Sequence, residues 1–190
     1  MQAQVEALTT VAKKMTSSGK DAQALEAYKT AAGLMPGAPW LQHRTAELAR
    51  KLKQPEVAAL HYRRAAVAFI RAGFPKRALA PLRTAWQVTV ALLPGDASSF
   101  ITITLELINV QRELGFTSDA KLSLGNANQA LRASGSAERV PSIAEIEARS
   151  SRPPAATRGS QPPDSGVQHH SVAPPNSEAM LSRLSAAVKP

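Results

Sequence analysis

The chain has 190 residues, no cysteine and a formal net charge of +9. This length suits one ordinary domain with tails, and the lack of cysteine excludes disulfides, thiolate metal ligands and a cysteine nucleophile. No apolar run approaches the roughly 20 residues of a membrane helix, and the N-terminus does not have the pattern of a signal peptide, so we expect a cytoplasmic protein.

Apolar residues recur with helical spacing as far as position 133, interrupted by glycine and proline. Such interruptions are typical of helix ends. The pattern predicts about seven helices, over residues 2–18, 22–34, 39–53, 56–72, 76–92, 97–114 and 118–133. The sixth is ambiguous, because residues 101–107 alternate with period two as a β-strand would. Its length and its helical neighbours favour a helix.

A small–aromatic–small pattern on one helical face occurs twice, as Ala24-Tyr28-Ala31 and as Ala58-Tyr62-Ala65. Spacing of i, i+4 and i+7 puts all three side chains on one side of a helix. The offset between the two copies is the same at all three positions. A repeat period of about 34 residues resembles the tetratricopeptide-repeat (TPR) family. Residues 5–38 carry that family's pattern at Leu8, Val11, Ala12, Met15, Gly19, Ala24, Tyr28, Ala31 and Pro36.

The second unit, residues 39–72, departs from the family pattern in its first helix. Gln42 and Thr45 occupy positions that are usually large and apolar. The helix over 56–72 also fits the first-helix pattern of a further unit, through Ala66 and Phe69, so it can pair with either neighbour. The resemblance implies an all-α, TPR-like α-solenoid of antiparallel helices over residues 1–134.

TPR-family proteins bind their partners in a concave groove lined by the first helix of each repeat. The groove positions that the resemblance implies here are Lys13, Trp40, His43, Glu47, Arg50, Asn109 and Arg112. Chaperone-binding members hold a peptide's terminal carboxylate in a clamp. Lys13 and Glu47 stand where the asparagines of that clamp would be, and Glu47 would repel a carboxylate. We therefore expect no chaperone clamp.

Most of the excess positive charge lies in residues 43–83, which carry ten basic and two acidic side chains. The basic face expected on these helices comprises Lys51, Arg63, Arg64, Arg71, Lys76 and Arg77. Two interpretations remain open: a solvated face, or a surface for an acidic partner. Nucleic acid is the weaker version of the second, since aromatic residues for base stacking are scarce.

No catalytic pattern is present: the sequence has no glycine-rich phosphate loop, no His-Glu-x-x-His and no serine elbow. His43 and His61 are expected at the surface or in the groove rather than in a catalytic role. His169-His170 has no third ligand nearby and is a weak metal signal. The sequence therefore predicts no enzyme, no cofactor and no metal site.

The composition changes from residue 135, where serine, proline and arginine become frequent and paired prolines exclude a continuous helix. We expect a disordered linker over 135–175, with room for a short helix within 141–150. Residues 176–190 form a short amphipathic segment whose apolar face comprises Met180, Leu181, Leu184 and Val188. Two interpretations stay open: an unstructured end, or a docking helix for a partner or for the chain's own groove.

The favoured function is a non-enzymatic adaptor or scaffold, of bacterial type by its composition, that captures a peptide or helix of a protein partner in the groove. The basic segment favours an acidic partner. The alternatives are a small TPR-type secretion or assembly chaperone and a nucleic-acid binder with a basic face.

Overall fold

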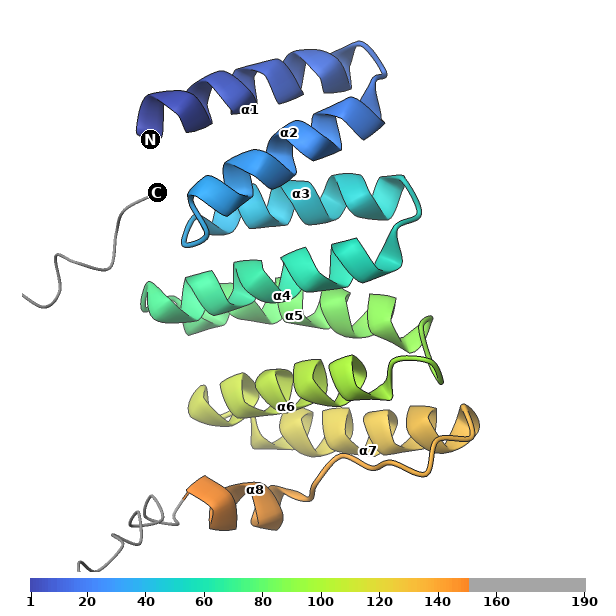
Figure 1. Ribbon diagram of the computed structural model, residues 1–190. Coiled ribbons are helices and arrows are strands. Elements are labelled where there is room, and N and C mark those ends of the chain that lie inside the picture. Colours follow the sequence, from blue (N-terminus) through green and yellow to red (C-terminus); the bar gives the residue numbers. More distant parts are fainter. Residues whose placement is uncertain (151–190) are drawn as a thin grey trace, which may run out of the picture. The chain divides into compact units, whose positions relative to one another are not determined.

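The computed structural model describes residues 1–150, and every regular element in this range is an α-helix. His169-His170 and the predicted C-terminal segment lie outside the described residues. The helices follow one another as antiparallel neighbours (Figure 1). They are α1 (Gln2–Ser17), α2 (Asp21–Leu34), α3 (Pro39–Lys51), α4 (Pro55–Arg71), α5 (Pro75–Val90), α6 (Ala97–Glu113), α7 (Thr117–Ala133) and α8 (Ile143–Ser150). The predicted all-α, TPR-like solenoid is confirmed, and α8 lies where the sequence left room for a short helix within 141–150.

Glycine and proline set the helix boundaries as the sequence predicted. Gly19 and Gly73 follow α1 and α4 with φ of 71° and 80°, a left-handed conformation that glycine adopts without steric cost. Pro39, Pro55 and Pro75 stand in the first turns of α3, α4 and α5, where a missing N–H leaves no helical hydrogen bond unmade. These local signals divide the chain into short antiparallel hairpins.

The ambiguous sixth segment is the helix α6 and not a strand. Phe100, Ile103, Leu107 and Ile108 are buried, with the spacing of one helical face rather than that of alternate strand residues. Thr104, one of the residues that suggested a strand, is buried as well, and its hydroxyl donates to the Phe100 carbonyl at 2.8 Å. Burial of this face outweighs the weak preference of β-branched residues for strands.

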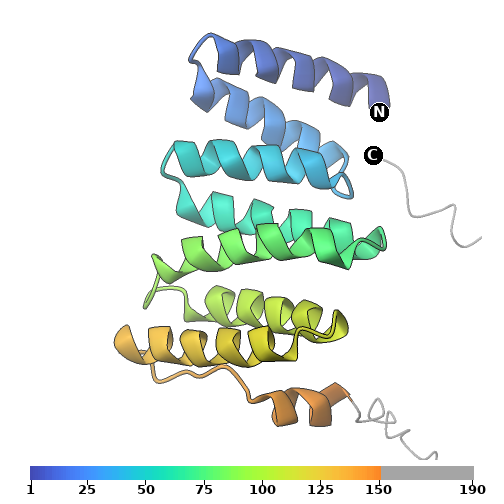
Figure 2. The same ribbon diagram turned by 180° about the vertical axis from the view of Figure 1, so that it is seen from behind.

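Alanine dominates the contacts around α4. Ala58 and Ala66 of α4 are fully buried, as are Ala46 of α3 and Ala78 and Ala85 of α5. Small side chains let neighbouring helices approach closely, and α4 packs extensively against both α3 and α5 (Figures 1 and 2). The two pairings that the sequence allowed for this helix therefore exist together.

A buried polar network replaces the expected apolar residues in α3. Gln42 donates through Nε2 to the Ala32 carbonyl at 3.1 Å, and its Oε1 accepts a hydrogen bond from His61 Nδ1 at 2.7 Å. Both side chains are buried, so the expectation that His61 lies at the surface or in the groove is wrong. The network joins the end of α2, α3 and α4, and it satisfies the polar atoms that burial would otherwise leave unpaired.

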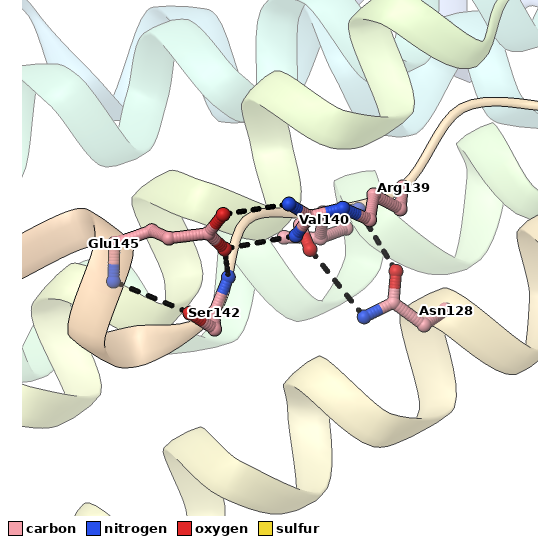
Figure 3. A network of polar contacts seen from close by, with 5 residues as sticks. All are labelled: Asn128, Arg139, Val140, Ser142 and Glu145. Carbon is pink, nitrogen blue, oxygen red and sulfur yellow. Dashed lines mark hydrogen bonds and ion pairs between the residues drawn. The ribbon is translucent and has the colours of Figure 1, made fainter.

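The packed domain continues beyond residue 134, into the first part of the predicted linker (Figure 3). Val140 is fully buried, and Asn128 of α7 accepts from its backbone N–H at 2.8 Å. Ser142 and Glu145 then form a reciprocal capping box at the start of α8. The Arg139 guanidinium and the Ser142 bonds hold the pKa of Glu145 well below its usual range. The boundary expected at residue 134 is therefore too early, because these contacts order the chain as far as α8.

Candidate functional site

A hollow of about 640 Å³ opens on the side of α1, α3 and α5, the side on which α3 and α5 lie in front in Figure 2. Five helices contribute to it, and we call it the α1–α3–α5 hollow. Its lining residues are Lys13, Tyr28, Trp40, His43, Arg44, Glu47, Phe69, Arg77, Ala80 and Pro81. An adjoining hollow of about 430 Å³ shares Lys13, Tyr28, Arg44 and Glu47 and reaches Lys51.

Four of the predicted groove residues meet in this hollow: Lys13 from α1 and Trp40, His43 and Glu47 from α3. The Trp40 side chain is half exposed, at 50%, although it is one of the largest apolar groups of the chain. The His43 ring meets the edge of the buried Tyr62 ring, with centroids 5.5 Å apart. The hollow thus contains the half-exposed Trp40 ring next to the His43 ring, which is held by its packing against Tyr62.

Ion pairs neutralise only part of the charge in this region. Lys51 contacts Asp21 at 2.6 Å, and Glu47 contacts Arg44 at 2.9 Å. Within residues 1–150, Lys13 and Arg77 have no ion-pair partner, although Arg77 lies over the Phe74 ring, 5.0 Å from its centroid. Two cations therefore remain available to an acidic ligand beside Trp40.

The remaining predicted groove residues lie elsewhere. Arg50 is exposed near the end of α3. Burial raises the pKa of the Tyr62 hydroxyl, and the nearby charge of Arg50 lowers it by a smaller amount. Asn109 is exposed on α6, and Arg112 contacts Glu147 of α8 at 2.6 Å. Neither α6 residue lines the hollow, since α5 and not α6 follows α3 on this side. Their expected place in the groove assumed that α6, rather than α5, follows α3 on this side.

The predicted basic face is divided between separate surfaces. Lys51 and Arg77 belong to the hollows on the α3 and α5 side, and Lys76 is exposed on α5. The three arginines of α4 line a different hollow, of about 830 Å³, between α2 and α4. One of them, Arg63, is held by Glu106 through both carboxylate oxygens, at 2.6 to 2.9 Å. The basic residues therefore do not form one continuous face.

Several lining residues were not expected as groove residues. Tyr28 and Phe69 were assigned to the core pattern, yet both border the α1–α3–α5 hollow. Arg77 was assigned only to the basic face. Proline begins α3, α4 and α5 alike, so this local signal does not tell which of these helices line the hollow.

A further hollow, of about 370 Å³, lies between α5, α6 and α7. The Nε1 of Trp86 and the Oε1 of Gln111 are buried at its wall with no hydrogen-bond partner in the part of the chain that the structure describes. Buried polar atoms normally have a hydrogen-bond partner, and one that lacks it typically costs about 1–3 kcal/mol.

No group of three or more histidine, cysteine or acidic side chains within residues 1–150 could hold a metal ion. None of the described helices has both the length and the hydropathy that a bilayer crossing requires.

Comparisons with known proteins give structural likenesses of low similarity. One is the crystal structure of BtubC (BKLC) from P. vanneervenii, at 14% identity and a TM-score of 0.35, covering 89% of this chain and 71% of that one. Another is the crystal structure of MamA protein, at 14% identity and a TM-score of 0.30, covering 70% of this chain and 94% of that one. No family model and no curated protein matches the sequence.

Proposed function

We propose that this chain is a non-enzymatic cytoplasmic adaptor that binds a peptide or helix of a protein partner in the α1–α3–α5 hollow. One observation carries the proposal: a half-exposed tryptophan lies in a hollow to which five helices contribute. Exposed aromatic residues at such places are the usual anchors of protein–protein binding. The volume of about 640 Å³ is in the range of pockets that bury a few side chains.

The charges suggest what kind of partner this hollow accepts. Lys13 and Arg77 have no ion-pair partner in the described residues, and they favour an acidic side chain on the ligand. Trp40, together with Phe69, favours an apolar or aromatic side chain next to it. Glu47 carries a negative charge in the same hollow and disfavours a second carboxylate at that point. The fitting ligand is a segment with one aromatic or apolar anchor and one acidic group.

The test is affinity purification from the native cells with quantitative mass spectrometry. Wild-type chain is compared with Trp40→Ala and Arg77→Glu, and Leu122→Ala serves as the matched control because Leu122 is an exposed apolar residue of α7. We expect recovery of the specific partner to fall by about tenfold or more in the first two variants, since truncating an anchor typically costs about 2 kcal/mol or more. Equal recovery with all four proteins, at unchanged helix content, would refute the proposal.

A further inference from the structure

The hollow between α2 and α4, which we call the α2–α4 hollow, has a wall of small residues opposite a wall of arginines. Its volume of about 830 Å³ makes it larger than the α1–α3–α5 hollow. Ala32 and Gly33 of α2 form one side together with Gly37 of the following loop, and α4 contributes Leu60, Val67 and its three arginines. Leu60 is 43% exposed, so apolar surface lies open next to the positive charge.

Carboxylates balance only part of the positive charge of this hollow. No acidic side chain lines it, and Arg63 is already held by Glu106. Within residues 1–150, Arg64 and Arg71 take part in no ion pair and in no side-chain hydrogen bond, and both are exposed. They are seven residues apart on α4, about two turns or roughly 10 Å along the helix axis.

If the arginines served only as a solvated surface, the accessible apolar side chains beside them would have no role. The small residues of α2 allow another helix to approach closely. A Cβ atom added at Gly33 or at Gly37 would meet no atom within 4 Å, so this wall faces open space rather than a packed neighbour. Protein–protein interfaces combine a polar rim with an apolar contact area, and the unpaired arginines next to accessible apolar surface form the same combination here.

We infer that the α2–α4 hollow is a second protein-docking surface, and that its occupant is an acidic amphipathic helix of a partner protein. The helix places small or aliphatic side chains against Ala32, Gly33 and Leu60. Two of its carboxylates, about two turns apart, contact Arg64 and Arg71. A nucleic acid fits less well, because no aromatic side chain lines this hollow for base stacking and its apolar wall would stay uncovered.

This surface is separate from the one assigned to the proposed function. Phe69 of α4 borders the α1–α3–α5 hollow, whereas Arg64 and Arg71 border the α2–α4 hollow. The helices α2 and α4 lie in front in Figure 1, and α3 and α5 lie in front in the opposite view of Figure 2. Binding at the α2–α4 hollow can therefore be tested independently of binding at the α1–α3–α5 hollow.

The test uses the full chain and three labelled probes. The first is a helical peptide of about 18 residues with an alanine and leucine stripe and two glutamates seven residues apart. The second has glutamine in place of both glutamates, and the third is a single-stranded RNA of similar length. Binding is followed by fluorescence anisotropy, and the contact surface is mapped by amide chemical shifts of the labelled protein.

We expect the glutamate peptide to bind about tenfold or more tightly than the other two probes and to shift amides of α4 and of the end of α2. The double variant Arg64→Glu/Arg71→Glu should lose this preference. Gly33→Leu should weaken binding by filling the hollow, and it should fold because the added side chain meets no atom within 4 Å at Cβ. Trp40→Ala and the exposed control Lys121→Glu should bind the peptide like the wild type.

Three results would overturn the inference. The first is equal binding of the glutamate and glutamine peptides. The second is tighter binding of the RNA than of the glutamate peptide. The third is an unchanged affinity in Gly33→Leu together with amide shifts confined to the α1–α3–α5 hollow. Since the Trp40→Ala variant reports on the first hollow alone, failure of the two proposals can be told apart.

Discussion

Protonation of His61 should destabilise the fold, because this histidine is buried between helices and close to other cations. Burial, and to a lesser degree the charges of Arg64 and Lys29, lower its pKa from 6.5 to about 4. In the unfolded chain the same histidine titrates near its ordinary pKa of about 6.5. Between these two values the unfolded state binds more protons than the folded state, so stability falls as the pH falls.

The size of the effect follows from the two pKa values of His61. Relative to mildly alkaline pH, the loss in unfolding free energy is about 1 kcal/mol at pH 6, about 2 kcal/mol at pH 5 and about 3 kcal/mol at pH 4. This contribution of His61 should be almost fully present above about pH 7 and largely lost below about pH 4. For a small helical domain, a loss of this size is a large part of the total stability.

The assay is urea unfolding followed by circular dichroism at about pH 7.5, 6 and 5. His61→Gln removes the titration but keeps hydrogen-bonding capacity toward Gln42, so its stability should change much less over this range. His43→Gln is the matched control, since His43 is a partly exposed histidine of α3 that lies outside the buried Gln42–His61 pair, and this substitution should leave the pH dependence caused by His61 unchanged. Parallel loss of stability in wild type and in His61→Gln would refute the reasoning, because carboxylates rather than His61 would then dominate.

Substitutions at other packed positions should shift stability in both directions. Ala58→Leu or Ala65→Leu should each cost about 1–3 kcal/mol in urea unfolding by overpacking fully buried sites, and near-wild-type stability in both would mean that α4 packs differently. Gln111→Leu should add about 1 kcal/mol by removing an unpaired buried oxygen, whereas a loss would show that this oxygen has a partner. Asn128→Ala removes the hydrogen bonds to Val140 and should speed amide hydrogen exchange in α8 but not in α1 to α5; unchanged exchange would assign the anchoring of α8 to apolar contacts alone.

Local patterns predicted the fold well. The face formed by Ala24, Tyr28 and Ala31 is buried, and so is its copy on α4. Such a face can be recognised in the sequence because its three residues lie within about two helical turns. In α6 the β-branched residues favoured a strand, whereas the length of the segment favoured a helix. The burial of Phe100 and Ile108 on one helical face decides for the helix.

The contacts that the sequence did not predict join residues on different helices. Gln42 looked like a mismatch to the repeat pattern because its partner, His61, lies further along the chain on another helix. Asn109 and Arg112 were misplaced for a related reason, since the groove register depends on whether α5 or α6 follows α3. The helix α8 was different: Ser142 and Glu145 carry a readable capping-box signal within the segment expected to be linker.

Because α4 borders both hollows and is fixed by alanine contacts on two sides, it offers a mechanical link between them. Alanine side chains have no rotamers to rearrange, so at these contacts the helix would respond to a ligand by moving as a rigid body. A ligand that fits the resting position of α4 would leave the opposite hollow unchanged, and the two binding free energies would then add. A measured departure from additivity would report a displacement of α4 itself, which makes this helix the place to observe communication between two bound partners.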